Sequence, residues 1–187
     1  MLGSDFLSSE VSVEIDIKRR FLPIVEIGYG STDTWDVKGI HYKSAAPYFR
    51  VGMNYNTMYK KKDKNNMFYV GLRYAISSMN YDVSAVGVTD PIFEGETNPL
   101  IEDWIWGETL PYDREGLKAT IHWLEIVAGV RVQVFKSLYM GWALRMKYRQ
   151  KNDISEYGNP WYVPGFGTYN SSKMGVTYSI IYKLPFK

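Results

Sequence analysis

The side chains best suited to acid–base chemistry in this 187-residue sequence are its two histidines, His41 and His122. Neither lies in a metalloprotease motif, and no phosphate loop, dinucleotide fingerprint or EF-hand spacing occurs. The absence of cysteine excludes disulfides, Cys-ligated zinc and thiol catalysis. Ser77 or Ser78 with His122 and Glu125 would form a hydrolytic triad, but Glu125 has the opposite parity to His122. We therefore expect no catalytic residue, cofactor or metal, and His122 as an interfacial polar anchor; the alternative is a lipid hydrolase that uses His122.

A second set of candidates consists of acidic and basic side chains that recur at alternate positions of several segments. They do not form one motif, so only folding can bring them together. Buried charges are tolerated when they are paired and hydrogen-bonded. The sequence therefore predicts an internal charge network of Glu14, Asp16, Glu26, Arg50, Arg73, Glu125, Arg131, Arg145 and Lys147.

The third candidate is an acidic and aromatic segment over 78–119, which we expect to be one long loop. Its middle holds Glu102, Asp103, Trp104, Trp106 and Glu108. Exposed aromatic and acidic side chains suit a protein, glycan or divalent-ion partner. In the alternative interpretation the loop folds over the mouth of a barrel, with its tryptophans as a small core of their own.

The elements that must position these residues all alternate with period two. Apolar and polar residues alternate over 9–18, 21–31, 47–58, 67–77, 120–134, 138–149 and 173–186. A helical template fails, since it would place Arg131 beside Leu124 and Val127. These segments predict a single all-β domain over 1–187.

The connections between these segments are alternately short and long. This arrangement is typical of an up-and-down antiparallel barrel, either soluble or in an outer membrane. A soluble calycin-like carrier would turn its apolar face toward a ligand, and a membrane barrel would turn it toward lipid. The segments also reach the roughly 9–11 residues that a tilted membrane strand needs.

Glycine decides between the two faces. The glycines share the parity of the charged residues, whereas the other face carries almost uniformly large apolar side chains. Because the concave side of a closed sheet has less room, the small residues belong inside. The pattern therefore favours a membrane barrel with a charged, side-chain-filled lumen over a soluble sheet with a solvated charged face. The glycines concerned are Gly28, Gly30, Gly52, Gly71, Gly129, Gly141 and Gly175.

The number of strands is also informative. Bacterial single-chain membrane barrels have an even strand count with both termini periplasmic. The first visible segment runs toward a short turn, so it starts on the long-loop side. We expect an eighth strand, preceded by a signal peptide, upstream of Met1; the alternative is a soluble seven-stranded protein with an unpaired edge.

Three runs carry a family resemblance. Residues 18–23 (KRRFLP), 46–55 (APYFRVGMNY) and 159–167 (NPWYVPGFG), with 122–125 (HWLE) and 139–142 (YMGW), resemble an uncharacterised family of predicted small outer-membrane β-barrels from Bacteroidota. The resemblance covers nearly the whole chain. It implies an outer-membrane location and a cleaved signal peptide, and it implies no particular activity.

The function expected from these features is structural, adhesive or partner-binding. A net charge of +2 does not suggest a nucleic-acid partner. The long loops would be extracellular and the short turns periplasmic, with outer-membrane lipid around the barrel. An eight-stranded lumen is filled by side chains, so a general porin is not expected.

Overall fold

The structure is a computed structural model that describes residues 6–35, 40–61, 66–85, 113–154 and 159–184. These residues form strands and turns without a helix, so the all-β prediction is confirmed. The strands are β1 (Phe6–Glu14), β2 (Phe21–Trp35), β3 (Ile40–Asn56), β4 (Asn66–Ala85), β5 (Asp113–Phe135), β6 (Leu138–Ile154), β7 (Tyr162–Val163), β8 (Gly167–Thr168) and β9 (Ser172–Tyr182).

Some proteins cross a membrane with a long apolar helix. Within the described residues, no helix has the length and apolar character needed to cross a bilayer.

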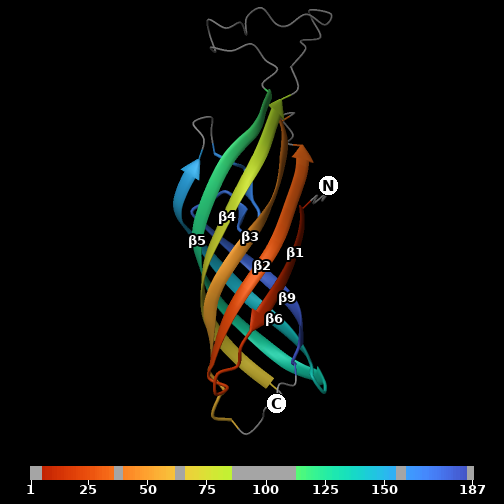
Figure 1. The fold of residues 1–187 in the computed structure, drawn as a ribbon, viewed down its shortest axis with the longest axis vertical. Coiled ribbons are helices and arrows are strands. Elements are labelled where there is room, and N and C mark those ends of the chain that lie inside the picture. The colour runs from red at the N-terminus through yellow and green to blue at the C-terminus, as the bar shows by residue number, and fades with distance from the viewer. Residues whose placement is uncertain (1–5, 36–39, 62–65, 86–112, 155–158, 185–187) are drawn as a thin grey trace, which may run out of the picture.

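Seven of the strands form one sheet in the order β1-β2-β3-β4-β5-β6-β9. Each pairs antiparallel with its neighbour, which confirms an up-and-down meander, and the strands run tilted along the long axis of the molecule (Figure 1). The sheet curls strongly, as shown by the distance of 2.6 Å between Glu14 of β1 and Arg131 of β5 across the interior. The strands therefore enclose an interior in the form of a half-barrel.

The two edge strands run in the same direction. They are the first and last strands of an alternating seven-stranded meander. In the described part of the chain, β1 pairs with β2 and β9 pairs with β6, and β1 and β9 do not pair with each other. The outer edge of each strand is therefore open.

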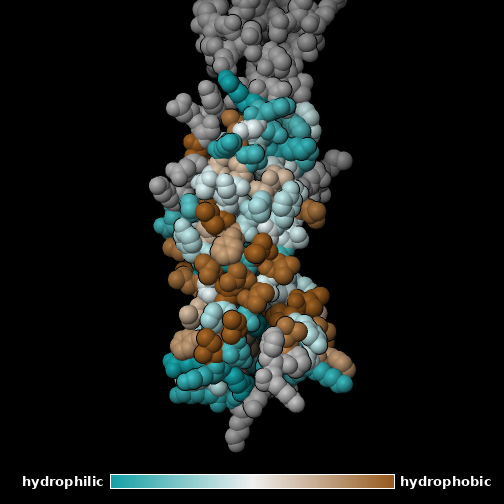
Figure 2. Space-filling model, viewed as in Figure 1, coloured by the Kyte–Doolittle hydropathy of each residue, from teal (hydrophilic) through white to brown (hydrophobic). Residues whose placement is uncertain are grey.

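The large apolar side chains point away from the interior. Val11 is 75% exposed, Ile27 58%, Trp142 62% and Val176 71%. Figure 2 shows such residues as a hydrophobic band across the middle of the molecule, with hydrophilic zones on both sides of it. This is the orientation that the glycine pattern predicts, with the small and charged parity facing inward.

Two glycines show why the interior parity needs small residues. Gly28 pairs with Tyr48 and Gly129 pairs with Tyr69 across neighbouring strands. A Cβ on Gly129 would lie 2.5 Å from Cζ of Tyr69, and a Cβ on Gly28 would collide with the Tyr48 ring. Each glycine thus leaves the space in which a large interior ring crosses the neighbouring strand.

The strands extend further than the alternating apolar pattern indicates. Residues 78–85 and 113–119 continue β4 and β5, so the prediction of one loop over 78–119 is wrong at both ends. The reason is that the two faces exchange their chemical character above Ile76, although the same alternate positions still point inward. On β4, Ser78 and Asn80 point outward, whereas Met79 and Tyr81 are buried inside. The apolar outward parity that marks the lower strand is therefore absent here.

Candidate functional site

The register of the sheet brings the interior charges to one level. Glu26 of β2 pairs with Arg50 of β3, and Glu125 of β5 lies between Arg73 of β4 and Lys147 of β6. Each of these residues has the inward parity of its strand. Cross-strand pairing alone therefore places opposite charges side by side, and the curl of the sheet adds contacts across the interior.

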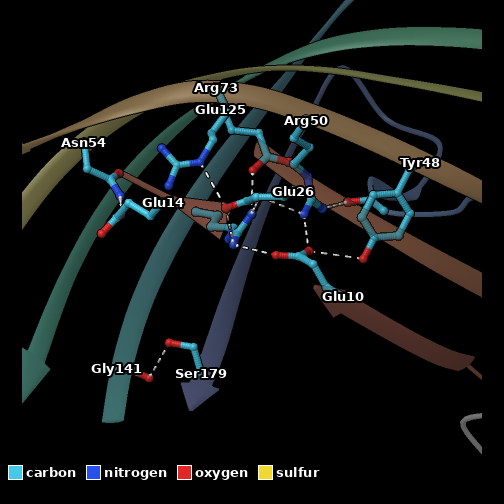
Figure 3. Close-up of polar contacts among 12 residues, drawn as sticks. Glu10, Glu14, Glu26, Tyr48, Arg50, Asn54, Arg73, Glu125, Gly141 and Ser179 are labelled. Carbon is cyan, nitrogen blue, oxygen red and sulfur yellow. Dashed lines mark hydrogen bonds and ion pairs between the residues drawn. The ribbon is translucent and has the colours of Figure 1, made fainter. Parts of the chain in front are cut away.

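Glu26 is at the centre of this charge cluster. Its carboxylate accepts from Arg73 Nε at 3.1 Å and from Arg145 Nη1 at 2.8 Å, and Arg50 Nη1 lies 3.3 Å away (Figure 3). Glu26 is 1% exposed, Arg73 2% and Arg50 3%. Because water is excluded at this depth, each charge depends on its protein partners.

Two further carboxylates complete the cluster. Glu125 lies 2.9 Å from Arg50 Nε, an ion-pair contact in which the N–H is not aligned with the carboxylate. It also contacts Arg145 Nη1 at 3.2 Å and accepts from Trp123 Nε1 at 2.7 Å. Glu10 of β1 contacts Arg50 and accepts from Arg145 Nη2 at 3.1 Å. The three carboxylates Glu10, Glu26 and Glu125 thus balance the three guanidinium groups of Arg50, Arg73 and Arg145.

A second interior group lies nearer the turns. Arg131 forms a bidentate pair with Glu14, with N–O distances of 2.6 and 3.1 Å. Asn54 Nδ2 donates to the same carboxylate at 2.8 Å, and the Arg131 guanidinium lies 5.3 Å from the centroid of the Tyr69 ring. The planar bidentate geometry fixes both partners, and it joins β1 to β5 across the interior.

Above the charge cluster, residues 160–169 enter the interior as a plug that contains β7 and β8. The plug is attached by cations, since Lys147 Nζ donates to Gly165 O at 2.7 Å and Arg50 Nη2 donates to the same oxygen at 2.9 Å. Val163 and Phe166 of the plug are fully buried in an apolar core with side chains of β3, β4 and β5. The strand residues of that core include Tyr42, Tyr48, Met79, Tyr81, Leu117, Ile121 and Trp123.

Two hydrogen bonds in the upper region involve side chains whose pKa is shifted. Tyr42 donates to Tyr162 O at 2.8 Å, and burial raises the pKa of Tyr42 to about 12, so this hydroxyl remains a donor. At the outer rim, the hydrogen bond between His41 Nε2 and Asp33 Oδ1 at 2.6 Å holds the pKa of Asp33 below its usual value. These contacts fasten the plug and the β2–β3 end.

Most of the predicted charge network lies together in the interior. The exception is Asp16, which is exposed in the β1–β2 turn and accepts from the Arg19 backbone N–H at 2.7 Å. Placing Asp16 in the network is wrong, because β1 ends at Glu14 and the alternation does not continue into the turn. The prediction missed Glu10, although Glu10 has the same parity as Glu14. The predicted loop surface of Glu102, Asp103, Trp104, Trp106 and Glu108 lies outside the described residues.

The residues proposed for hydrolysis do not come together. His122 faces outward, and its Nδ1 lies 2.7 Å from the Tyr74 hydroxyl. Ser78 contacts Thr120, Ser77 is buried and donates to Pro47 O, and Glu125 lies inside with its arginine partners. A serine–histidine–acid relay is therefore not assembled by these residues. Among the described residues, no group of three or more histidine, aspartate or glutamate side chains is arranged so that it could hold a metal ion.

Comparison with known proteins identifies a family for this chain. A family model described as a domain of unknown function, DUF6048, matches residues 1–187. No match was found among curated proteins or among solved structures.

Proposed function

The chain belongs to the DUF6048 family, and we propose that it is a small outer-membrane β-barrel of a Gram-negative bacterium. In this proposal its role is structural, adhesive or partner-binding, and the connections at the plug end are extracellular. The short turns at the opposite end are periplasmic. The resemblance of its sequence motifs to Bacteroidota barrels supports a source in that group.

One observation carries the proposal: large apolar side chains cover the outside of a sheet whose inside holds buried ion pairs. Leu72, Ile126 and Leu144 are at least half exposed, while Glu125 behind them is completely buried. A soluble sheet would expose its charges and bury its apolar residues. The observed arrangement is the one a lipid environment favours.

The reversal of the faces above Ile76 supports the same conclusion. Outward residues change there from apolar to polar, and inward residues change from charged to apolar. A strand that leaves a bilayer and continues into water would need this change. We propose that the hydrophobic band spans the membrane and that the upper parts of β2 to β5 project beyond it.

The filled interior bears on the type of activity. Arg50, Arg73 and Glu26 occupy the interior at the level of the band, with the plug above them. This supports a barrel that does not act as a general porin. Partner binding would then fall to the extracellular connections, where a protein or glycan is the expected ligand.

The two alternative functions have less support. A soluble carrier needs an apolar cavity, yet the described interior is lined by charges at one level and filled by the plug at the next. Lipid hydrolysis through His122 needs a nucleophile and an acid beside it, and the neighbour of His122 is the Tyr74 hydroxyl. No specific contact favours either function.

Fractionation of cells that produce the native gene product tests the proposal. We expect the protein in the outer-membrane fraction, extracted by detergent, with migration on unboiled gels that changes on heating, because closed membrane barrels resist unfolding by cold detergent. Release into the soluble fraction without detergent would contradict the membrane assignment.

We further propose that one more strand closes the barrel between β1 and β9, the two edge strands of the described sheet. Both open edges run in the same direction, so a single oppositely directed strand pairs antiparallel with each. A second copy would not supply an antiparallel partner, because copies in one membrane share an orientation and their edges would meet in parallel.

Cysteine pairs across the seam test this closing strand, since the sequence has no cysteine. One cysteine replaces Val11 or Val13, and the other replaces Val176, Tyr178 or Ile180. If a strand intervenes, the pairs are about 10 Å apart, so we expect bridging by a dithiol reagent of that length and no direct disulfide. Efficient direct disulfides across the seam would show that β1 and β9 are neighbours.

A further inference from the structure

Two connections at the lower end of the sheet are held side by side. The Asn56 backbone N–H donates to Arg20 O at 2.9 Å, and Asn56 Nδ2 donates to Arg19 O at 2.8 Å. These bonds join the β1–β2 turn to the start of the β3–β4 turn. They create one surface with four exposed cations, Lys18, Arg20, Lys60 and Lys61, which we call the basic turn surface.

The backbone of the β1–β2 turn is shaped by an acid that does not neutralise this surface. Lys18 and Arg19 have positive φ values of 51° and 58°, which non-glycine residues rarely adopt. Asp16 Oδ1 supports this conformation by accepting from the Arg19 backbone N–H at 2.7 Å. Among the described residues, none of the four cations of the basic turn surface forms an ion pair with a carboxylate.

Aromatic rings hold two of these cations, Arg20 and Lys60, at the edge of the hydrophobic band. The Arg20 guanidinium lies 5.0 Å from the Phe21 centroid, 5.4 Å from that of Tyr55 and 5.0 Å from that of Tyr59. Lys60 Nζ lies 5.7 Å from the Tyr59 centroid. Figure 2 shows a hydrophilic zone directly below the band at this end. The basic turn surface thus lies where an inserted barrel would meet lipid headgroups.

We infer that the basic turn surface binds the phosphate groups of anionic glycerophospholipids in the leaflet next to the short turns. This inference rests on the proposed membrane function, because insertion of the hydrophobic band brings headgroups to the level of these cations. Ammonium and guanidinium groups are suited to phosphodiester oxygens, and aromatic rings are suited to the bilayer interface. With a chain net charge of only +2, the attraction is local to this end.

The test measures lipid selectivity of the full chain reconstituted in phosphatidylcholine vesicles. Spin-labelled phosphatidylglycerol or phosphatidylcholine reports the fraction of lipid immobilised by the protein. We expect a preference of roughly fivefold for phosphatidylglycerol, since one cation near a membrane surface contributes about that factor. Raising the salt concentration should reduce the preference, because these cations are exposed.

Matched variants assign the preference to this surface. K18Q/R20Q/K60Q/K61Q should abolish it, K18R/K60R/K61R should keep it, and K43Q/K118Q at the opposite end should leave it unchanged. An unchanged preference in the first variant, or an equal loss in the last, would overturn the inference. Stronger retention of lipid A than of phosphatidylglycerol through the same four cations would also overturn it, by assigning the other leaflet.

The proposed membrane function can fail separately in this experiment. A chain that does not enter phosphatidylcholine vesicles at all contradicts the barrel proposal, and the inference falls with it. A chain that inserts with full β structure but shows no phosphatidylglycerol preference contradicts the lipid inference alone.

Discussion

Replacing Arg145 with methionine is expected to lower the free energy of unfolding by about 3–5 kcal/mol, as for other buried pairs that lose one partner. Arg145 contacts Glu26 at 2.8 Å, Glu10 at 3.1 Å and Glu125 at 3.2 Å. Methionine has a similar length but no charge, so the buried Glu26 and Glu125 lose a partner where water is excluded, and the more exposed Glu10 loses one as well. Denaturant unfolding in lipid vesicles, followed by tryptophan fluorescence, measures the change.

A double-mutant cycle shows whether the charges act as one cluster. Arg145→Met combined with Glu26→Gln should cost less than the sum of the two single changes, by an amount in the range of about 0.5–3 kcal/mol found for contacting residues. Lys118→Met is the matched control at an exposed site and should change stability by no more than about 0.5 kcal/mol. Strict additivity of the two interior changes would contradict the direct contact between Arg145 and Glu26.

Leu72→Arg is the second change with a large expected effect. Leu72 points outward from β4, is 57% exposed and lies midway between Phe68 and Ile76 in the hydrophobic band. A charge at the middle of a bilayer on the lipid face of a barrel costs about 2–4 kcal/mol. In a water-soluble protein the same exposed substitution would change stability by about 0.5 kcal/mol or less.

Asn80→Arg supplies the matched control for Leu72→Arg. Asn80 lies on the same strand, also points outward and is exposed, but it is above the hydrophobic band. We expect little change in unfolding free energy for Asn80→Arg in the same vesicles. Equal and small effects at both positions would indicate that the band faces water, and they would contradict the membrane proposal.

Alternation and the lengths of the connections were sufficient to predict the seven-stranded antiparallel meander, and the parity of the glycines predicted the face that each strand turns inward. Period two in residues such as Leu124 to Val134 fixes which side chains share a face, whatever the partners are. The alternation fails where a single strand crosses from one environment to another. For this reason the sequence predicts a loop over residues 78–85 and 113–119, although they extend β4 and β5.

The candidate charge network was predictable as a set, but its pairing was not. Parity places Glu26, Arg73 and Arg145 on the inner face, and their opposite signs require them to be paired there. Parity does not say that Glu26 of β2 would contact Arg145 of β6, since that contact depends on the curl of the sheet. The same curl brings Glu10 into the cluster, and the end of β1 leaves Asp16 outside it.

The burial of the plug could be recognised only in the tertiary structure. Residues 160–169 contain no long alternating pattern, and their burial depends on Gly165 O meeting Lys147 and Arg50, which are distant in sequence. The sequence by itself therefore determined the strands, their parity and the requirement for paired charges, because these are local or one-dimensional properties. Only the tertiary structure decided which charges meet, where the faces reverse and what fills the upper interior, because those depend on curvature and register across strands.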